Sequence, residues 1–475
     1  MKNDSTARKR EPHKANLLQA FITFGLLILA MGVGIIVFEV DPHMPMFIGV
    51  IIAAVMALFL GFDWADIEQA MVHGITQALQ SIIILAIIGI LVGVWILAGV
   101  VPSMIYYGLM ILKPSIFLVA TVLICSITSL ATGSSWGTAG TMGIALMGVA
   151  HGMGIPAPLA AGAILSGAYF GDKMSPLSDT TNLAPAMAGT DVITHVKAMA
   201  KPTVLAYILT LGIFAYWSSK FAGGAADTSG IAVLQQGLAD NFTISPILLL
   251  PPVIVIVSIA LKVPAIPGIV LGIISATIMA PIFQGADFGQ ILGAGMDGYT
   301  AEFGIESLDR LLTAGGLSGM MFSISLTIIA MMFGGIAELT GTLEVIVNLI
   351  LKLAKGATGL VTATIATCIV SNLTMPEQYI SIVIPGRMYA KTYRDRGYHP
   401  KMLSSTLEAG GTVSGVFIPW HTCGVYMSGV LGVGVLQFAP YVYFNILMPI
   451  SAIVLTIIGQ NTFWAKDDPD TIVAD

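Results

Sequence analysis

The stretch SGAYFGDKMSPLSDTTN (residues 166–182) is the most informative part of this chain. It begins as an apolar, small-residue segment and continues with the polar side chains Asp172, Lys173, Ser175, Ser178, Asp179, Thr180, Thr181 and Asn182. Pro176 cannot donate a backbone hydrogen bond and disfavours helix for the residue before it. A helix broken inside a membrane is tolerated only where protein or a water-filled cavity surrounds the break. Because ionisable side chains at that depth are costly and by default functional, we interpret this segment as an ion or substrate site.

The composition is that of a polytopic membrane protein. Of the 475 residues 56% are hydrophobic and only 10% are charged, and the mean hydropathy is +0.90. An average soluble protein carries roughly 25% charged residues. The three cysteines, Cys125, Cys368 and Cys423, lie in apolar surroundings without a CxxC pair, so we expect no disulfide framework and no cofactor. The expected partner is the lipid bilayer, and no nucleic-acid partner is expected.

Apolar runs of about spanning length, roughly 17–25 residues, form two series. The first series lies at 17–38, 44–60, 78–100, 157–171 and 202–219. The second lies at 245–261, 264–283, 318–340, 402–419 and 440–462. Two more apolar regions, 115–150 and 358–388, are interrupted by the polar stretches ATGSSWGT (131–138) and TMPEQY (374–379). We predict that each of these two regions is a hairpin that dips into the membrane and returns.

The two series are related by an internal repeat. A constant shift of 243 residues pairs Cys125 with Cys368, Gly143 with Gly386, Gly154 with Gly397, Gly167 with Gly410 and Pro176 with Pro419. Further upstream, a shift of 242 pairs Gly93 with Gly335, and a shift of 224 pairs GFDW (61–64) with GADF (285–288). Matches at one offset that fall on Gly and Pro are typical of a structural repeat rather than of chance similarity between apolar segments.

Basic residues indicate that the two repeats are inverted. The loop 387–401 holds five Lys and Arg residues, whereas its repeat partner 144–158 holds none. Lys197 and Lys201 lie in 182–201, and the partner segment 425–444 has no basic residue. With five spans and one re-entrant hairpin in each half, both termini lie in the cytoplasm. Only Lys113, Lys220 and Arg310 then lie outside, and Lys173 lies in the broken helix, as the positive-inside rule requires. Fully crossing arms in place of the hairpins remain an alternative.

These patterns predict an all-α polytopic membrane protein of two inverted-topology repeats, with broken helices at mid-membrane. We divide the chain into a cytoplasmic tail (1–16), a first repeat (17–219), an external linker (220–244), a second repeat (245–462) and a cytoplasmic tail (463–475). Segments 101–113 and 343–356 are interpreted as interfacial helices that lead into the hairpins.

In this topology four polar breaks meet near mid-membrane: the hairpin tips and the broken fifth spans at 172–182 and 418–424. Broken helices offer bare carbonyls and amides, and with hydroxyls and carboxylates they suit Na+. We expect Asp172 and Asp179 to bind Na+, and Asp172, Asp179 and Glu377 to couple it to protons. The other candidate ligands are Thr132, Ser134, Ser135, Ser175, Ser178, Thr180, Thr181, Asn182, Asn372, His421 and Thr422.

Structural roles compete with several of these assignments. Asp172 could instead pair with Lys173, and Asp179 could cap a helix that begins at Thr180. Glu377 could be a first-turn acid stabilised by the helix dipole. His421 is a lone histidine in apolar surroundings, and such a residue is more often a structural group than a proton carrier. The hydroxyl residues could instead satisfy loose backbone.

The run GDKMSPLSDTTNLAP (171–185) resembles the signature of the NhaC-type Na+/H+ antiporter family, and ATGSSWGT and GGTVSGVFIPWHTCG (410–424) are similar to that family as well. The resemblance covers essentially the whole chain. It implies a bacterial inner-membrane antiporter of the wider ion-transporter superfamily that exchanges Na+ for H+ through inverted repeats and re-entrant hairpins. Relatives with similar motifs exchange malate for lactate, coupled to Na+ and H+.

Two functions therefore follow from the sequence. The first is Na+/H+ antiport by alternating access, and the second is Na+- and H+-coupled exchange of an organic acid such as malate or lactate. An enzyme is not expected, because we find no HExxH motif, GxSxG elbow or Cys/His dyad in a convincing context. The sequence leaves open the stoichiometry, the choice among Na+, Li+ and K+, the titrating aspartate and the oligomeric state, a homodimer included.

Overall fold

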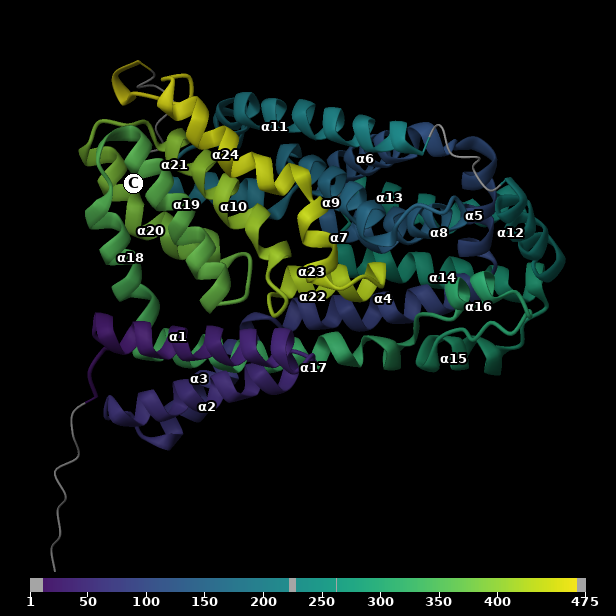
Figure 1. Cartoon of the computed structure of the whole chain (residues 1–475), viewed down its shortest axis with the longest axis horizontal. Coiled ribbons are helices and arrows are strands. Elements are labelled where there is room, and N and C mark those ends of the chain that lie inside the picture. The colour runs from purple at the N-terminus through teal and green to yellow at the C-terminus, as the bar shows by residue number, and fades with distance from the viewer. Residues whose placement is uncertain (1–11, 222–227, 262, 468–475) are drawn as a thin grey trace, which may run out of the picture.

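The computed structural model describes residues 12–221, 228–261 and 263–467. Across these residues the chain is helical and forms no β-strand, only two isolated β-bridges at Tyr299–Ala314 and Tyr398–Trp464. Figure 1 shows most of the long helices running along the longest axis of the molecule. Within the described ranges, seven helices are long and apolar enough to cross a membrane, or nine if two sharply bent pairs each count as one span. The prediction of an all-α polytopic membrane protein is confirmed.

The first half of the chain contains eleven α-helices, and the segment after it contains one. They are α1 (Leu17–Gly32), α2 (His43–Phe59), α3 (Trp64–Gln77), α4 (Leu79–Leu97), α5 (Val100–Ile111), α6 (Pro114–Thr132), α7 (Ser135–Thr138), α8 (Ile144–Gly152), α9 (Ala157–Met174), α10 (Asp179–Ala188), α11 (Val192–Lys220) and α12 (Thr228–Asn241). Because α12 lies in the segment predicted as an external linker, that linker is partly helical.

The second half repeats the order of the first. Its helices are α13 (Leu250–Ala260), α14 (Ala265–Gln284), α15 (Phe288–Asp297), α16 (Glu306–Leu312), α17 (Gly316–Thr340), α18 (Thr342–Leu353), α19 (Gly356–Thr374), α20 (Ile380–Asp395), α21 (Pro400–Leu407), α22 (Thr422–Leu431), α23 (Val435–Phe438) and α24 (Tyr443–Ile457). The segments predicted to lead into the hairpins are helical, as α5 and α18.

The two halves are arranged in opposite directions. In Figure 1 the first hairpin, α6 to α8, lies towards the end of the molecule that holds α5, α12 and α16. The second hairpin, α19 to α20, lies towards the opposite end, which holds α18 and the last described residues of the chain. The helix that follows each hairpin, α9 or α21, comes from the same end as its hairpin and breaks in the middle of the molecule. This is the inverted repeat predicted from the basic loops.

Side-chain contacts repeat with the same offset as the sequence. Ser129 Oγ donates to the carbonyl of Ala168 at 2.6 Å, and Asn372 Nδ2, 243 residues later, donates to the carbonyl of Gly411 at 2.8 Å. A Cβ on Gly167 would meet Cys125, and one on Gly410 would meet Cys368. The hairpin arm and the broken helix therefore cross in the same way in both halves, at glycines that admit no side chain.

A second symmetric contact joins the halves to each other. Gly93 on α4 packs directly on the backbone of Ala294 on α15, and Gly335 on α17 packs directly on the backbone of Ala70 on α3. These are reciprocal contacts, because the shift of 242 relates the two glycines and the shift of 224 relates the two alanines. Close approach of this kind at small residues is how membrane helices gain packing energy without a hydrophobic driving force.

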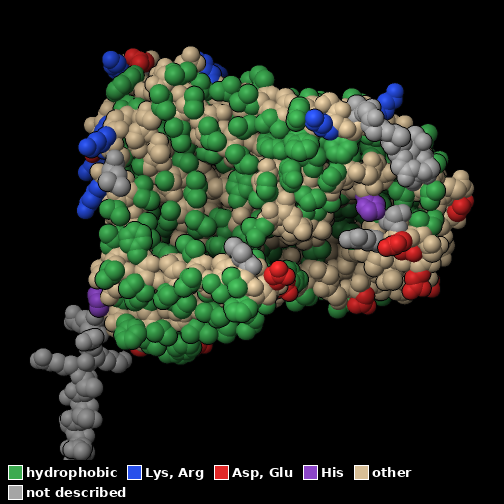
Figure 2. Space-filling view, viewed as in Figure 1, with side chains coloured by type: hydrophobic (Ala, Val, Ile, Leu, Met, Phe, Trp, Pro, Cys, Tyr) green, Lys and Arg blue, Asp and Glu red, His purple; other side chains and the backbone are tan. Residues whose placement is uncertain are grey.

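Charge divides the molecule along its long axis. Figure 2 shows Lys and Arg gathered at the end that holds α18 and α20, whereas most Asp and Glu side chains of this face lie towards the end that holds α12 and α15. The exposed basic residues include Lys352, Lys355, Lys391, Arg394 and Arg396, and the exposed acidic ones include Asp240, Asp297, Glu302 and Glu306. The long axis is therefore the direction in which the protein crosses the bilayer.

Candidate functional site

A small cavity lies where the broken helices meet. Its volume is about 90 Å³, room for a few water molecules, because one water occupies about 30 Å³ of liquid. The start of α4, the first hairpin tip, the break after α9 and the second hairpin tip all contribute to its wall. The lining residues are Gln80, Ser81, Ile84, Gly133, Ser134, Trp136, Asp172, Ser178, Asp179, Thr180, Glu377, Gln378 and Tyr379.

Asp172 is the cavity carboxylate that is most firmly held by hydrogen bonds. It lies in the last turn of α9 and is 6% exposed. One of its oxygens, Oδ2, accepts hydrogen bonds from the backbone N–H of Ser135 at 3.1 Å and from Ser135 Oγ at 2.6 Å. Ser135 is the first residue of α7, whose N-cap is Ser134, so the carboxylate of Asp172 also faces a helix N-terminus. The hairpin tip therefore holds the carboxylate in one orientation.

The hairpin tip can reach Asp172 because glycine ends α6. Gly133 has φ +68°, in the left-handed region, and a Cβ at this position would overlap Leu177 and Ser178 of the break. Glycine is the residue that adopts this conformation without strain and leaves room for the neighbouring chain. The first tip and the first break thus pack backbone to backbone beside the cavity.

Asp179 lies at the open rim of the cavity. The helix α10 begins at Asp179, and its N-cap is Ser178. The alternative in which Asp179 caps a helix that begins at Thr180 therefore places the helix start one residue too late. Asp179 is exposed, and its Oδ2 accepts a long hydrogen bond of 3.4 Å from Tyr379 of the second repeat. The structure therefore separates the two aspartates: Asp172 is buried and fixed, and Asp179 is accessible.

Glu377 is the third carboxylate of the cavity and the one from the second repeat. It is 3% exposed, and its Oε2 has no hydrogen-bond partner among the described residues. The hydroxyls of Thr422 and Ser81 approach it, and that of Thr422 is likewise unpaired. A buried carboxylate oxygen beside an unpaired hydroxyl offers two oxygen atoms of the kind that suits a small hard cation.

Four of the predicted ligands hold the backbone of the site instead. Ser175 Oγ donates to the carbonyl of Leu130 at 2.8 Å, and Thr181 Oγ1 donates to that of Lys173 at 3.1 Å. Asn182 Nδ2 donates to two carbonyls of the break, and Thr132 Oγ1 donates to a carbonyl within α6. These side chains bond to backbone carbonyls of α6 and of the break, and they do not line the cavity.

His421 and Asn372 form a closed network behind the second tip. His421 Nε2 lies 2.8 Å from Asn372 Oδ1, and His421 Nδ1 accepts from the backbone N–H of Cys423 at 3.0 Å. Asn372 Nδ2 donates to Gly411 and Ser414. Both side chains are wholly buried and outside the cavity lining, so the structural interpretation of His421 fits its position.

The structure also shows site residues that the sequence did not single out. Gln80 and Ser81 line the cavity from the joint at Ala78, where α3 ends and α4 begins. The sequence signal that could have indicated them is the polar stretch TQALQS (76–81), which directly precedes an apolar run. The direct ion-pair partner of Lys173 is Glu408 and not the adjacent Asp172. Glu408 is an isolated acid in an apolar stretch, and only the tertiary structure reveals its partner.

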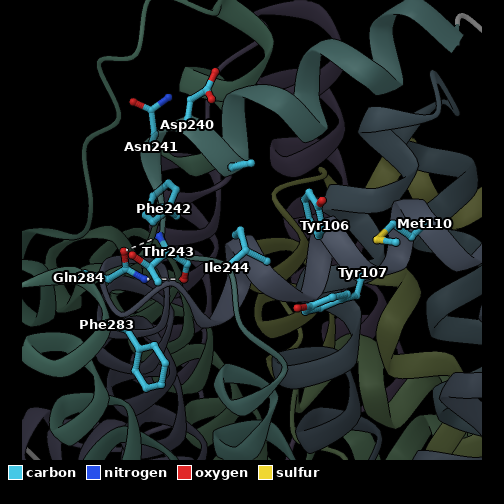
Figure 3. Close-up of a pocket in the computed structure, with 11 residues that line it drawn as sticks. Tyr106, Tyr107, Met110, Asp240, Asn241, Phe242, Thr243, Ile244, Phe283 and Gln284 are labelled. Atoms are coloured by element: carbon cyan, nitrogen blue, oxygen red, sulfur yellow. Dashed lines mark hydrogen bonds between the residues drawn. The ribbon is translucent and has the colours of Figure 1, made fainter.

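A larger hollow of about 740 Å³ lies away from these carboxylates. It is formed by α5, the end of α12 and the end of α14. Figure 3 shows Tyr106, Tyr107, Phe242 and Ile244 around it, and a Gln284 amide that bonds to the Thr243 backbone. Its lining contains one carboxylate, that of Asp240 (Figure 3). It does not have the buried ionisable groups of the mid-molecule cavity.

Comparison with known proteins identifies the family. The Na+/H+ antiporter family profile matches residues 167–460. This range includes three of the four breaks, and the first hairpin tip (131–138) lies before it. The chain is 37% identical to the NhaC Na+/H+ antiporter of Alkalihalophilus pseudofirmus over 93% of this chain and 96% of that protein. The chain belongs to the Na+/H+ antiporter family.

Relatives in this family carry different substrate names. The malate-2H+/Na+-lactate antiporter of Bacillus subtilis is 37% identical over 95% of this chain and 97% of its own length. The arginine/ornithine antiporter ArcD of Halobacterium salinarum is 37% identical over 95% of this chain and 93% of its own length. The family therefore identifies the chain as a transporter more firmly than it identifies the cargo.

The charge of the cavity in this antiporter-family member indicates the kind of cargo. Its lining holds three carboxylates, those of Asp172, Asp179 and Glu377, and none of the described lining residues is Lys, Arg or His. A concentration of negative charge in a low-dielectric cavity attracts cations and repels anions. The geometry therefore suits a small cation.

We expect Ser135→Ala to weaken Na+ binding without abolishing transport. The substitution removes the 2.6 Å hydroxyl bond to Asp172 and retains the backbone N–H bond. A hydrogen bond to a charged group contributes about 1.5–3 kcal/mol, and here it favours the anionic form of Asp172 over the protonated form. Without it H+ competes better with Na+ at this carboxylate, so at fixed pH the apparent KM for Na+ should rise roughly tenfold. The measurement is the Na+ dependence of proton movement in everted vesicles. Ser175→Ala, which removes a hydroxyl outside the cavity, is the matched control and should leave the KM near the wild-type value.

Proposed function

We propose that this protein exchanges Na+ for H+ across the bacterial inner membrane by alternating access. The observation that carries the proposal is the buried carboxylate of Asp172, oriented by Ser135 beside a cavity that has room for a cation with few waters. Asp172 is the proposed Na+ ligand, with Ser134, Ser178 and Thr180 as neighbouring oxygens. Asp179 is the proposed ligand at the rim, where a cation enters.

Proton coupling follows from the same group of acids. A carboxylate that holds a proton cannot also serve as an anionic ligand for Na+, so the two cations exclude each other at one site. Asp172, Asp179 and Glu377 are the cavity carboxylates that could alternate in this way. If the transporter changes its facing side only when the site is loaded, exchange becomes obligatory. The inverted repeats supply the two equivalent facing states.

The charge division of the molecule supports a cytoplasmic location for both termini. The described ends of the chain lie at the end of the molecule where Lys and Arg gather. Basic residues are retained on the cytoplasmic side of a membrane. We therefore place the tails, α18 and α20 in the cytoplasm, and α12 and α15 outside.

Organic-acid exchange is the second candidate, because one relative is named for malate and lactate. The structure does not favour it in this conformation. An organic anion would need donor groups, but His421 and Asn372 bond to each other, and Lys173 pairs with Glu408. Sites for small organic molecules have volumes of roughly 300–1,000 Å³, whereas this cavity has about 90 Å³. A cationic amino acid would suit the charge of the cavity but not its volume.

The test uses proteoliposomes that contain a fluorescent pH reporter. We expect an inward Na+ gradient alone to change the internal pH. The same experiment is then repeated with malate, lactate, arginine or ornithine added. A response that needs one of these organic solutes would replace Na+/H+ exchange by exchange of that solute, and the second-repeat residues would then be examined as its ligands.

A further inference from the structure

The most unusual buried charges of this protein lie outside the cavity. Lys173 Nζ on α9 lies 3.7 Å from Glu408 Oε2, and both side chains are 0% exposed. Within the described residues, neither the ammonium nor either carboxylate oxygen has a hydrogen bond. Removing two charges from water costs several kcal/mol per ion, and supporting hydrogen bonds normally repay part of that cost. This pair lacks that support.

Glu408 also begins a π-helical turn (Glu408–Thr412), a distortion that is frequent at functional sites.

The internal repeat shows that the fold does not need this ion pair. The shift of 243 places Val416 opposite Lys173 and Leu165 opposite Glu408. Both of these residues are buried, so the other half of the molecule fills the equivalent positions with apolar side chains. Replacing a buried ion pair by apolar residues of similar size is often neutral or stabilising. The pair is therefore an addition to the symmetric scaffold, and we look for its role in transport.

The position of the pair ties it to the cation site. Lys173 directly follows Asp172, and both Asp172 and Glu408 act electrostatically on it. The other titratable groups around the pair are His195 on α11 and Cys368 on α19. Asp172 differs from Glu408 in its surroundings, because Ser135 donates two hydrogen bonds to the Asp172 carboxylate and Glu408 receives none. Two hydrogen bonds stabilise the anionic form of Asp172, whereas Lys173 is the one group that stabilises the anionic form of Glu408 among the described residues.

We propose that Glu408 carries the transported proton and that Lys173 is a counter-cation shared by Asp172 and Glu408. This inference rests on the proposed Na+/H+ exchange and changes only where the proton binds. Without Na+, Lys173 balances the Asp172 carboxylate and Glu408 holds a proton. When Na+ binds, it balances Asp172, Lys173 balances Glu408, and the proton leaves Glu408 for water.

Charge balance then enforces the exchange. The proton-loaded cluster (Asp172 anion, Lys173 cation, neutral Glu408) and the Na+-loaded cluster (Asp172 anion with Na+, Lys173 cation, Glu408 anion) are both neutral. A cluster with neither cation carries one negative charge, and a cluster with both carries one positive charge. An unbalanced charge is expensive at the centre of a bilayer, so only the two neutral states cross easily. The exchange is one Na+ for one H+ and moves no net charge.

A buried polar contact lies one helical turn from Glu408. Ser404 lies one helical turn before Glu408 on α21, and its Oγ is 2.9 Å from His195 Nδ1. His195 is buried, but it lies in the first turns of α11, close to the exposed Asp191 and Ile193. The Nε2 atom of His195 has no partner among the described residues.

The decisive variant copies the other repeat. K173V/E408L replaces Lys173 and Glu408 by the residues at the repeat-related positions, Val416 and Leu165. The chain itself therefore shows that these apolar side chains can be packed at equivalent positions. The purified full chain is reconstituted and assayed for uptake of ²²Na+ against internal unlabelled Na+ and for Na+-driven change of internal pH. We expect the variant to retain Na+/Na+ exchange within about threefold of wild type and to lose at least nine-tenths of the pH response. A pH response near that of wild type would overturn the inference.

The single variant E408Q gives a second and opposite prediction. Glutamine has the shape of protonated Glu408 but cannot release a proton, so a Na+-loaded cluster keeps one excess positive charge. We expect E408Q to lose Na+/Na+ exchange as well as the pH response, and thus to be more impaired than the double variant. Na+/Na+ exchange at the wild-type rate in E408Q would contradict the shared counter-cation. If K173V/E408L does not fold, this nearly isosteric variant decides alone. A wild-type protein without a Na+-driven pH response would instead remove the proposed function.

Discussion

We expect Asp172→Asn to abolish both Na+-driven proton movement and Na+/Na+ exchange in proteoliposomes. The substitution keeps the size of the side chain and removes the charge that would face Na+. Two unit charges 4 Å apart interact by about 4 kcal/mol at an effective dielectric constant of 20, which corresponds to roughly a thousandfold in affinity. The cavity provides little water to compensate, because its volume is only about 90 Å³. Transport should therefore fall below detection at millimolar Na+.

Asp179→Asn is the matched control for this prediction. It removes a carboxylate from the same cavity and the same broken segment, but from the exposed rim. Water and salt screen an exposed charge, so we expect a higher KM for Na+ and a maximal rate within a fewfold of wild type. If Asp172→Asn transported like wild type and Asp179→Asn were inactive, the cation site would be assigned to the rim of the cavity.

We expect Gly335→Leu to prevent stable assembly of the two halves. Gly335 packs directly on the backbone of Ala70 and close to the backbone N–H of Gly74 on α3. A side chain there would meet main-chain atoms, which cannot move away by changing rotamer. Overpacking of a closed contact costs about 1–3 kcal/mol and occasionally more, and we expect the upper end here. The yield of monodisperse protein in detergent and its Tm should both fall.

Gly319→Leu on the same helix separates packing from helix propensity. A Cβ at Gly319 meets no atom within 4 Å. Replacing a helical glycine is favourable by up to about 1 kcal/mol on propensity alone. We expect the yield and Tm of this variant to equal or exceed those of wild type. Equal loss in both variants would show that α17 tolerates no larger side chain anywhere, and the special role of the Gly335–Ala70 contact would be wrong. Gly93→Leu, at the reciprocal contact with Ala294, should behave like Gly335→Leu.

The sequence was sufficient for the architecture because the signals for it are local or periodic. Apolar length defines the spans, Pro176 and its equivalent Pro419 mark the breaks, and the distribution of Lys and Arg orients the repeats. In the structure, residues related by the shift of 243 make equivalent bonds, as Ser129 and Asn372 do. Each of these signals can be read without knowing which helices touch.

The composition of the site depended on contacts between distant segments. The sequence placed Asp172, Asp179, Glu377, His421 and many hydroxyl residues in one region, but it could not distinguish a side chain that faces the cavity from one that satisfies a loose carbonyl. That distinction depends on rotations of a few tens of degrees within broken helices, which no periodicity specifies. His421 and Asn372 accordingly lie in a closed network, and Gln80 and Ser81 enter the cavity wall from a helix joint.

By itself, the sequence determined a membrane protein of two inverted, broken-helix repeats with carboxylates at its centre. Only the tertiary structure decided which carboxylate is held by hydrogen bonds and which partner Lys173 takes. Glu408 is 235 residues away from Lys173 along the chain, and the adjacent Asp172 was the nearer candidate in sequence. A helix points consecutive side chains in different directions, so the near neighbour was not the partner. The crossing of α9 with the turn after α21 made the pair.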